Sequence, residues 1–401
     1  MNLRKIAFIT QAAPWAGNEL FGAYNLSQVK ALRALGAETE IFSPMIYVPP
    51  VLDRFHGGLR RLRGRPSEYE IESVPVHVVR GAYPHPVFLR WKVTPRAPGL
   101  AAGWVKRAVI GGLERQIAEF GPDVLLVHDG LILGKLAAAL SKKLNVPWAV
   151  IEHDPIDVAP DSRAGRFYTR TMRDARRVFT VHRPTATYLQ EKMDLPQARL
   201  VLNGTIRPTE QQWRTPRPEK WTGKKVILSV GSYIPRKARP ELVRAFAEVD
   251  AKEAVLVLLG PGAAPAELRQ LIEQSGVRDC VEIVGAMGPQ DVQQYMVWAD
   301  VFALPSWWEA FGLVYLEAMA ARTPVILSSD SGMAAEIEHG VHGWIVPPKD
   351  HGALVAALRE ALGGADLAAM GARGQAVVEE RFTWERNART VLGELSERCD
   401  L

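Results

Sequence analysis

Two glutamates, Glu309 and Glu317, flank a Phe-Gly pair in the segment "SWWEAFGLVYLEAMA" (306–320). The first follows the apolar run "VFALP", which predicts a buried strand, and the second lies eight residues later inside a predicted helix. Ionised carboxylates accept hydrogen bonds from hydroxyl groups, and the free N–H groups at a helix start, here near Gly312 and Leu313, bind anions. The segment therefore predicts a helix start that could bind phosphate, with a carboxylate on either side of it.

Two cations, Arg236 and Lys237, lie in "SVGSYIPRKAR", directly after another predicted strand, "KVILSVG". A helix start with two cations would bind a diphosphate, because both the helix dipole and the side chains carry positive charge there. An ordinary basic surface loop is the other interpretation of this pair. Two anion-binding helix starts in one sheet favour a nucleoside diphosphate as the ligand.

His153 follows the predicted strand "WAVIE", and His128 ends the predicted strand before it. From position alone a structural role for His153 is the alternative to a functional one. A zinc site built from both histidines and carboxylates is a further interpretation, although no close-spaced ligand motif supports it. The sequence also lacks G-x-S-x-G, G-x-x-x-x-G-K-[ST], and a G-x-G-x-x-G after "KIAFIT", which argues against an α/β-hydrolase, a P-loop NTPase and a nicotinamide dehydrogenase.

Short apolar runs alternate with helical patterns along both halves of the chain. Continuous β-branched runs such as "DVLLVHD" and "AVLVLLG" predict strands that are buried on both faces, as in a parallel sheet covered by helices. Regular alternation of strand and helix predicts doubly wound α/β sheets. Because 401 residues fit two domains, the two series predict two Rossmann-like domains.

The domain boundaries follow from a polar stretch with several prolines, "NGTIRPTEQQWRTPRPEKWTGKK". We expect a first domain at 1–205, a linker at 206–224, a second domain at 225–380, and a C-terminal helix at 381–401 that could cross back onto the first domain. Ligands bind beyond the carboxyl ends of parallel strands, so a cleft between the domains would collect the strand-end residues of both.

The net charge of +5 hides a basic excess in residues 50–110, for example "RFHGGLRRLRGR". A solvated basic face is one interpretation; a surface for anionic lipid headgroups or an anionic acceptor is the other, since Trp and Phe accompany the arginines. No nucleic-acid-binding module accompanies the charge.

The number of cysteines and the hydropathy of the sequence indicate the cellular compartment in which the protein works. Two distant cysteines, Cys280 and Cys399, suit a reducing compartment, and the apolar run that opens the chain is too short for a signal peptide. No apolar stretch approaches the ~18 residues of a membrane span. We expect a cytoplasmic protein with weak peripheral contact at the inner face of the membrane through residues 50–110.

The segment "SWWEAFGLVYLEAMAARTPVILSSDSG" resembles the retaining glycosyltransferases of family 4, which have the GT-B fold. Their mark is a pair of glutamates separated by seven residues within S-x-x-E-x-F-G-x-x-x-x-E-A-M-A-x-G-x-P-V-I, and Glu309 and Glu317 have that spacing. Further stretches agree in order, among them "VPWAVIEHD", "VILSVGSYIPRKA" and "HGVHGWIVPPKD". The resemblance implies an acceptor-binding first domain, a nucleotide-sugar-binding second domain and a cleft between them.

The resemblance also implies roles for single residues. It makes His153, Glu309 and Lys237 the catalytic candidates, with Glu317 on the nucleotide ribose. In the family an arginine follows the glycine that corresponds to Gly231, but this chain has Ser232 there, so Arg236 is a candidate replacement. In the family a glycine follows the lysine that corresponds to Lys237, and this chain has Ala238 in its place. The resemblance places around the donor Gly17, Gly22, Gly231, Arg236, Lys237, Gly285, Met287, Glu309, Phe311, Gly312, Leu313 and Glu317.

The implied reaction is retaining transfer of a sugar from a nucleoside-diphosphate donor, UDP first and GDP second, to an acceptor hydroxyl in glycan, polysaccharide or glycolipid synthesis. The acceptor and its binding residues stay unknown. We expect no metal or other cofactor, because the cations neutralise the diphosphate and no Asp-x-Asp triplet is present. The alternatives are a non-catalytic GT-B scaffold that binds nucleotide-sugar and acts through a partner, and a GT-B relative with other chemistry, such as an epimerase or a phosphorylase.

Overall fold

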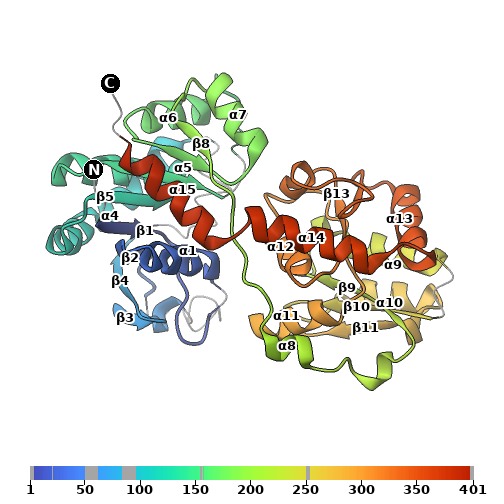
Figure 1. Ribbon diagram of the computed structural model, residues 1–401. Coiled ribbons are helices and arrows are strands. Elements are labelled where there is room, and N and C mark those ends of the chain that lie inside the picture. The colour runs from blue at the N-terminus through green and yellow to red at the C-terminus, as the bar shows by residue number, and fades with distance from the viewer. Residues whose placement is uncertain are drawn as a thin grey trace. The chain divides into compact units, whose positions relative to one another are not determined.

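The structure is a computed structural model that describes residues 4–19, 21–49, 62–83, 96–153, 156, 158–249 and 253–397. The chain divides into two compact units (Figure 1): unit 1 comprises Met1–Leu202 with Trp384–Leu401, and unit 2 comprises Asn203–Thr383. The segment that the sequence suggested as a linker, 206–224, belongs to unit 2. It contains the short helix α8 (Glu210–Arg214) and the 3₁₀ turn η2 (Glu219–Trp221).

Unit 1 is built on an eight-stranded sheet in the order β3-β4-β2-β1-β5-β6-β7-β8. The paired strands are parallel except for the β3–β4 pair, which is antiparallel. The central strands are buried on both faces, as their continuous apolar runs predict. The strands are β1 (Lys5–Ile9), β2 (Glu38–Ile46), β3 (Glu68–Ile71), β4 (Val74–Gly81), β5 (Val124–His128), β6 (Trp148–Glu152), β7 (Val178–Thr180) and β8 (Ala198–Leu200).

Helices cover this sheet and close its core. Apolar residues of α4 and α5, such as Leu113 and Leu136, pack with Val127 of β5 in one buried cluster. The described helices of unit 1 are α1 (Ala23–Ala34), α4 (Pro98–Phe120), α5 (Gly130–Leu144), α6 (Arg163–Met172), α7 (Arg183–Glu191) and α15 (Trp384–Ser396).

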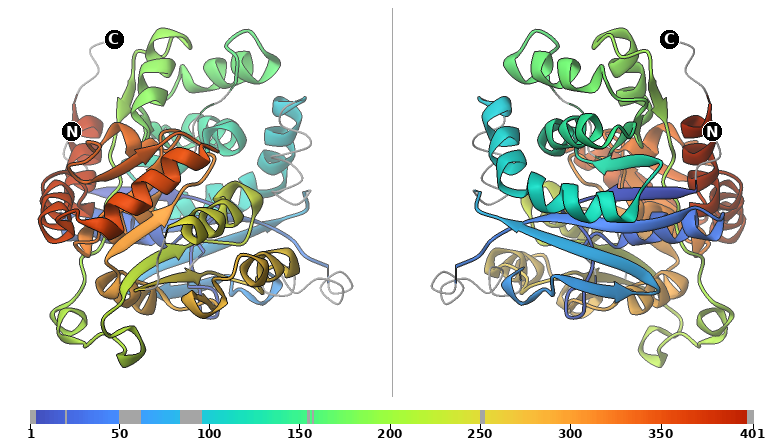
Figure 2. Two further views of the ribbon diagram at one scale, coloured as in Figure 1. Left: turned by 90° about the vertical axis from the view of Figure 1, so that its right-hand side faces the viewer. Right: turned by 90° about the vertical axis from the view of Figure 1, so that its left-hand side faces the viewer.

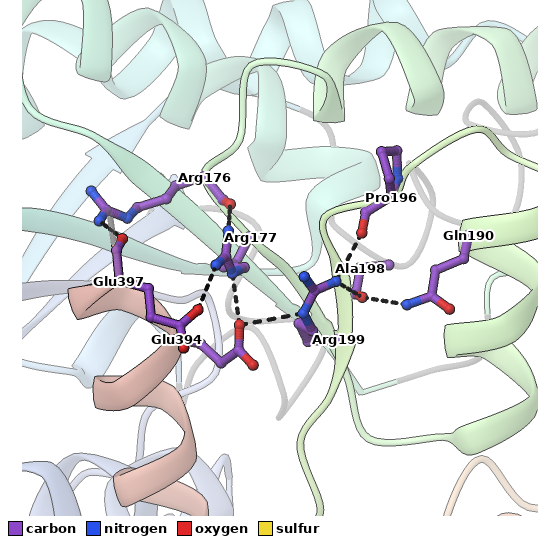
Figure 3. A network of polar contacts seen from close by, with 8 residues as sticks. All are labelled: Arg176, Arg177, Gln190, Pro196, Ala198, Arg199, Glu394 and Glu397. Atoms are coloured by element: carbon purple, nitrogen blue, oxygen red, sulfur yellow. Dashed lines mark hydrogen bonds and ion pairs between the residues drawn. The ribbon is translucent and has the colours of Figure 1, made fainter. Parts of the chain in front are cut away.

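The C-terminal helix α15 packs against α1, the first helix of the chain, so segments far apart in the sequence lie side by side in unit 1 (Figure 1). A polar network fixes the far end of α15 (Figure 3). Arg177, which precedes β7, donates hydrogen bonds to Glu394 Oε2 at 2.8 Å and to Glu397 Oε2 at 3.2 Å, and Arg199 of β8 lies 3.4 Å from the same Glu394 oxygen. Because the Arg177 side chain is nearly buried, it depends on these carboxylates for its charge balance.

Unit 2 is built on a six-stranded parallel sheet in the order β11-β10-β9-β12-β13-β14. The strand order reverses between β9 and β12, and in doubly wound sheets ligands bind at the carboxyl ends beside such a switch point. The strands are β9 (Lys225–Val230), β10 (Ala254–Leu259), β11 (Val281–Val284), β12 (Val301–Leu304), β13 (Val325–Ser328) and β14 (Gly343–Val346).

Two sets of helices pack on this sheet, α9 with α10 and α13, and α12 with α11 and α14; side views are given in Figure 2. No helix among the residues that the structure describes is both long enough and apolar enough to span a bilayer. The remaining elements of unit 2 are η3 (Pro235–Lys237), α9 (Arg239–Glu248), α10 (Ala266–Gln274), η4 (Arg278–Cys280), α11 (Pro289–Trp298), α12 (Leu313–Ala320), η5 (Gly332–Ala335), α13 (His351–Gly363) and α14 (Leu367–Arg381).

Candidate active site

Glu309 lies between β12 and α12 in unit 2, and its backbone is held by the loop after β13. Its N–H donates to the Asp330 carbonyl at 3.4 Å, and its carbonyl accepts from the Gly332 N–H at 3.3 Å. The residue is only 7% exposed. This short bridge holds the backbone of Glu309 in place beside the loop after β13.

Two cations share one oxygen of that carboxylate. Lys237 Nζ donates a hydrogen bond to Glu309 Oε1, and Arg236 Nη1 lies 3.2 Å from the same oxygen. Arg236 also donates to the Trp308 carbonyl at 3.0 Å, and its own carbonyl accepts from the Trp307 N–H at 2.8 Å. The structure thus brings together three residues that the sequence selected from segments 72 residues apart.

The cluster is electrostatically asymmetric, since it holds two positive charges against one negative charge. Burial lowers the pKa of Lys237, the Glu309 carboxylate opposes that shift, and the neighbouring Arg236 adds to it. An anion bound beside Lys237 would raise its pKa again, because it would stabilise the ammonium form. The cluster therefore favours an anionic ligand.

Arg239 is a further cation here, which the sequence analysis missed. It is 2% exposed, and its Nη2 donates to the carbonyls of Gly231 at 2.5 Å and Leu259 at 2.6 Å. It thereby joins the loops that follow β9 and β10. Burial lowers the pKa of Arg239 to about 10, so it remains charged at neutral pH. Nothing in the residue spacing distinguished it from a surface arginine.

Gly312, the N-cap residue of α12, has a backbone φ of +90°, and a Cβ there would lie 2.5 Å from the Tyr315 ring. Tyr315 is itself fixed, because its hydroxyl donates to the Leu304 carbonyl at 2.7 Å. Only glycine fits this position without strain. Phe311 before it is buried, with its carbonyl accepting from Ser331 Oγ at 3.2 Å, and Leu313 is the first residue of the helix.

Glu317 lies in the second turn of α12, and its side chain is half-buried. Within the described residues its carboxylate has no hydrogen bond or ion pair, and burial raises its pKa to about 7. A hydroxyl donor beside this carboxylate would relieve the cost of its ionisation.

Three further candidate donor residues also lie after strands of unit 2. Gly231 follows β9. Gly285, which is exposed, and Met287, which is half-buried, follow β11.

In unit 1, His153 follows β6 and stacks on His128, with 4.7 Å between the ring centroids. The Tyr24 ring lies 4.6 Å away from His153. Burial, with His153 as a second cause, lowers the pKa of His128 well below its usual value, so His128 is neutral. His128 Nε2 lies 3.2 Å from Gln28 Oε1. The described residues contain no group of three or more side chains suited to a metal ion.

The two candidate glycines of unit 1 differ in their surroundings. Gly22, the N-cap residue of α1, has a φ of +76°, and a Cβ there would clash with the Ala12 carbonyl. Gly17 has a φ of +88° in an exposed turn, with no atom within 4 Å of an added Cβ, and its N–H donates to Glu19 Oε1 at 2.8 Å. Gly22 is therefore required by the fold, whereas Gly17 is required only by its own backbone conformation.

Comparison with solved structures defines the class of the fold. The chain is similar to sucrose-phosphate synthase from Thermosynechococcus elongatus, with a TM-score of 0.72, 22% identity and 98% of each chain covered. It is also similar to Anabaena HepE, solved in complex with UDP and glucose, with a TM-score of 0.70, 19% identity, and 98% of this chain and 99% of that chain covered. The fold is therefore of the GT-B type.

Sequence comparison then identifies the family within this class of fold. Residues 21–204 match the glycosyl transferase 4-like domain, and residues 211–375 match the group 1 glycosyl transferases. A match of 148 residues is 36% identical to the amylovoran biosynthesis glycosyltransferase AmsK of Erwinia amylovora and covers 35% of this chain and 36% of AmsK. A match of 250 residues is 30% identical to D-inositol 3-phosphate glycosyltransferase of Mycobacterium marinum and covers 61% of this chain and 50% of that protein. The chain belongs to glycosyltransferase family 4, and the matches span about a third to a half of these curated relatives.

Proposed function

We propose that the protein is a retaining glycosyltransferase that moves a sugar from a nucleoside-diphosphate donor to an acceptor hydroxyl. One observation carries the proposal: Lys237 and Arg236 share the Glu309 carboxylate at the switch point of unit 2, and α12 carries Glu317, whose carboxylate has no partner within the part of the chain that the structure describes. This arrangement offers cations for a diphosphate and carboxylates for hydroxyl groups within one parallel sheet.

The leaving group of this reaction is a nucleoside diphosphate, on which negative charge develops as the bond to the sugar breaks. Lys237, Arg236 and the N–H groups at the start of α12 would stabilise that charge. Glu309, which is fixed by its backbone bridge, would accept hydrogen bonds from the sugar hydroxyls. Because these groups offset negative charge on the diphosphate, we propose that transfer needs no metal ion.

Glu317 would accept hydrogen bonds from the ribose, and Gly285 and Met287 would border the base. We propose UDP as the first candidate nucleotide and GDP as the second. HepE was solved with UDP-glucose, and a Mycobacterium tuberculosis relative is named for its dependence on GDP-mannose. His153 of unit 1 is proposed to act at the sugar end of the donor.

We propose an acceptor in glycan, polysaccharide or glycolipid synthesis, bound by unit 1. Relatives are named for amylovoran biosynthesis and for phosphatidylinositol monomannoside mannosylation. A peripheral contact with the inner face of the membrane is part of this proposal. Residues 50–61 and 84–95 of the basic region lie outside the described residues, but α4 presents Leu100, Trp104 and Arg107 on an exposed stripe at helical spacing.

A thermal-shift panel of nucleotides and nucleotide sugars tests the donor, since a bound ligand raises the melting temperature by mass action. The donor that binds is then incubated with candidate acceptors, with and without EDTA, and the anomeric configuration of the product is read by NMR. We expect retained configuration and unchanged rates in EDTA. Donor binding without turnover would favour the scaffold interpretation, and no nucleotide binding at all would overturn the proposal.

A further inference from the structure

The two chain segments that join the units lie side by side in unit 2. The chain enters unit 2 at Asn203 and leaves it after Thr383. Thr205 pairs with Thr383 in a parallel bridge, and the Thr205 N–H donates to the Phe382 carbonyl at 3.0 Å. The entering segment therefore holds the backbone of Phe382, the residue that directly follows α14.

Phe382 also contacts the turn that precedes α12. Its ring centroid lies 6.1 Å from that of Phe311, with 48° between the ring planes. Phe382 is fully buried and Phe311 is 3% exposed, so the two rings belong to one close-packed interior. Phe311 lies between Glu309 and Gly312, the N-cap residue of α12, so a shift of Phe311 would displace the carboxylate and the helix start together.

A second connection to the same turn runs through the loop after β13. The Phe311 carbonyl accepts hydrogen bonds from the Met333 N–H and from Ser331 Oγ, both at 3.2 Å. Glu336 ends this loop just after η5, and its carboxylate accepts a hydrogen bond from Arg381, the last residue of α14. The Glu336 side chain is 1% exposed, so removal of Arg381 would take a cation away from a buried carboxylate.

Both connections start at neighbouring residues, Arg381 and Phe382, and both end at Phe311. The Arg381 guanidinium also lies over the Phe382 ring at 5.2 Å, so the two side chains support each other. N–H groups at a helix start stabilise a developing negative charge only when they are held in the correct direction, and small displacements of such groups reduce the rate.

We propose that Phe382, together with the Arg381–Glu336 ion pair, positions the donor site by holding the Phe311–Gly312 turn in the orientation that sugar transfer requires. The inference rests on the proposed function, in which the start of α12 binds the diphosphate. It gives the segment that leaves unit 2 a role in the reaction, although none of its residues touches the substrate.

Phe382→Leu tests the ring contact, because leucine keeps an apolar side chain but removes the ring. Turnover is measured as release of UDP from UDP-glucose and of GDP from GDP-mannose, with water as the acceptor, so that the test does not depend on the unknown acceptor. We expect kcat to fall at least about tenfold and KM to change less than about threefold, because the displaced groups act mainly on the transition state.

Phe246→Leu is the matched control for the loss of a buried ring. Phe246 of α9 is as deeply buried as Phe382 and packs in the core of unit 2, in a cluster that does not contain Phe311. The two variants should lose similar amounts of melting temperature, but Phe246→Leu should keep kcat within about twofold of wild type. A purely structural role for Phe382 would make the two variants alike in kcat as well.

A double-mutant cycle shows whether Phe382 acts through Phe311. Phe311→Leu and Phe382→Leu remove the same ring contact, so the loss of kcat in the double variant should be smaller than the product of the two single losses by at least about threefold. Losses that simply multiply would mean that the two rings act independently and would contradict the proposed path.

The ion pair is tested by Arg381→Met and Arg381→Lys. We expect Arg381→Met to lower kcat at least about fivefold and Arg381→Lys to lower it less, because an ammonium group can still pair with Glu336. Arg217→Met is the control, since Arg217 is exposed to a similar degree and pairs with Asp300 at 3.0 Å elsewhere in unit 2. It should leave kcat near the wild-type value. Because Arg381 is partly exposed, these variants carry the test even if Phe382→Leu does not fold.

Calorimetric titration of the wild-type chain with UDP and GDP separates this inference from the proposed function. If neither nucleotide binds, the proposed function fails and the inference fails with it. If a nucleotide binds and its sugar donor turns over, but Phe382→Leu and Arg381→Met lose only melting temperature and keep the wild-type kcat, the positioning role is overturned while the proposed function stands.

Discussion

Gln28 Nε2 donates a 2.7 Å hydrogen bond to Asn387 Oδ1, although 359 residues separate the two side chains. The bond joins α1 to α15 inside unit 1, where both residues are buried. Asn387 Nδ2 in turn donates to the Leu202 carbonyl at 2.8 Å, and His128 Nε2 lies 3.2 Å from Gln28 Oε1. Because each amide oxygen accepts and each amide nitrogen donates, His128 carries its proton on Nε2. The chain of bonds runs from the histidine pair to the last residue of unit 1 before unit 2 begins.

We expect Gln28→Leu and Asn387→Leu each to lower the free energy of unfolding by about 1–3 kcal/mol, because each leaves buried partners unpaired. Since the two residues share one bond, the double variant should cost less than the sum of the single variants. Urea unfolding measures all three. Arg389→Ala, which removes an exposed ion pair within α15, is the control and should cost under about 0.5 kcal/mol. Additive costs would mean that the two side chains act independently.

Lys237→Ala should reduce transfer by a factor of about 10²–10³, because it removes a fixed positive charge from the leaving diphosphate. Glu309 keeps Arg236 as a partner in this variant, so the melting temperature should change little. Steady-state rates check the predicted loss of transfer, and thermal unfolding checks the predicted melting temperature. Lys220→Ala, which breaks an exposed pair with Glu282, should leave both quantities near wild type. If Lys237→Ala transferred sugar at the wild-type rate from the donor that binds, Lys237 would not be the residue that stabilises the diphosphate.

Glu317 makes donor binding depend on pH. Its pKa of about 7 means that the carboxylate loses its charge as the pH falls below 7, and ribose hydroxyl groups bind best to the ionised form. We expect the dissociation constant of the nucleotide sugar to rise about three- to tenfold between pH 8 and pH 5.5. Calorimetry should show a flatter profile and weaker binding in Glu317→Gln. Glu360→Gln, at an exposed position of α13, should keep the wild-type profile.

The ionisation of Glu317 should favour donor binding but should lower the stability of the protein without ligand. Its pKa is raised in the folded state, so its contribution to stability is full below about pH 4.5 and is lost as the pH rises through about 7. Without ligand, Glu317→Gln should therefore stabilise the protein by roughly 1–2 kcal/mol at pH 8 and by little at pH 5. Chemical denaturation at both pH values checks this, and equal effects at the two values would rule out ionisation as the cause.

Gly22 and Gly17 form a matched pair for backbone strain, since both have positive φ. Gly17→Ala should cost about 1 kcal/mol, the usual penalty for a left-handed alanine. Gly22→Ala adds a clash with the Ala12 carbonyl and should cost about 3 kcal/mol or more. Melting temperatures of the two variants give the comparison, and equal losses would mean that the loop before α1 can move away from the added methyl group.

The sequence by itself determined that both halves of the chain form α/β sheets with buried strands, and it determined the local placement of Glu309 and Glu317. Continuous β-branched runs specify strands buried on both faces, and the Phe-Gly pair after "VFALP" specifies where α12 begins, because these are properties of neighbouring residues. The capping box Thr209–Gln212, which begins α8, was also readable in "TEQQ" but was overlooked within the supposed linker.

Only the tertiary structure decided which distant side chains meet. Lys237 reaches Glu309 because β9 and β12 are neighbours in the sheet, and Gln28 reaches Asn387 because α15 packs on α1. Neither neighbour relation is encoded in local periodicity. Arg239 likewise became a buried cation through the approach of two loops, and a charged residue in such a place has no local sequence mark. Contacts across the sheet depend on the order of the strands, which the pattern of each strand alone does not contain.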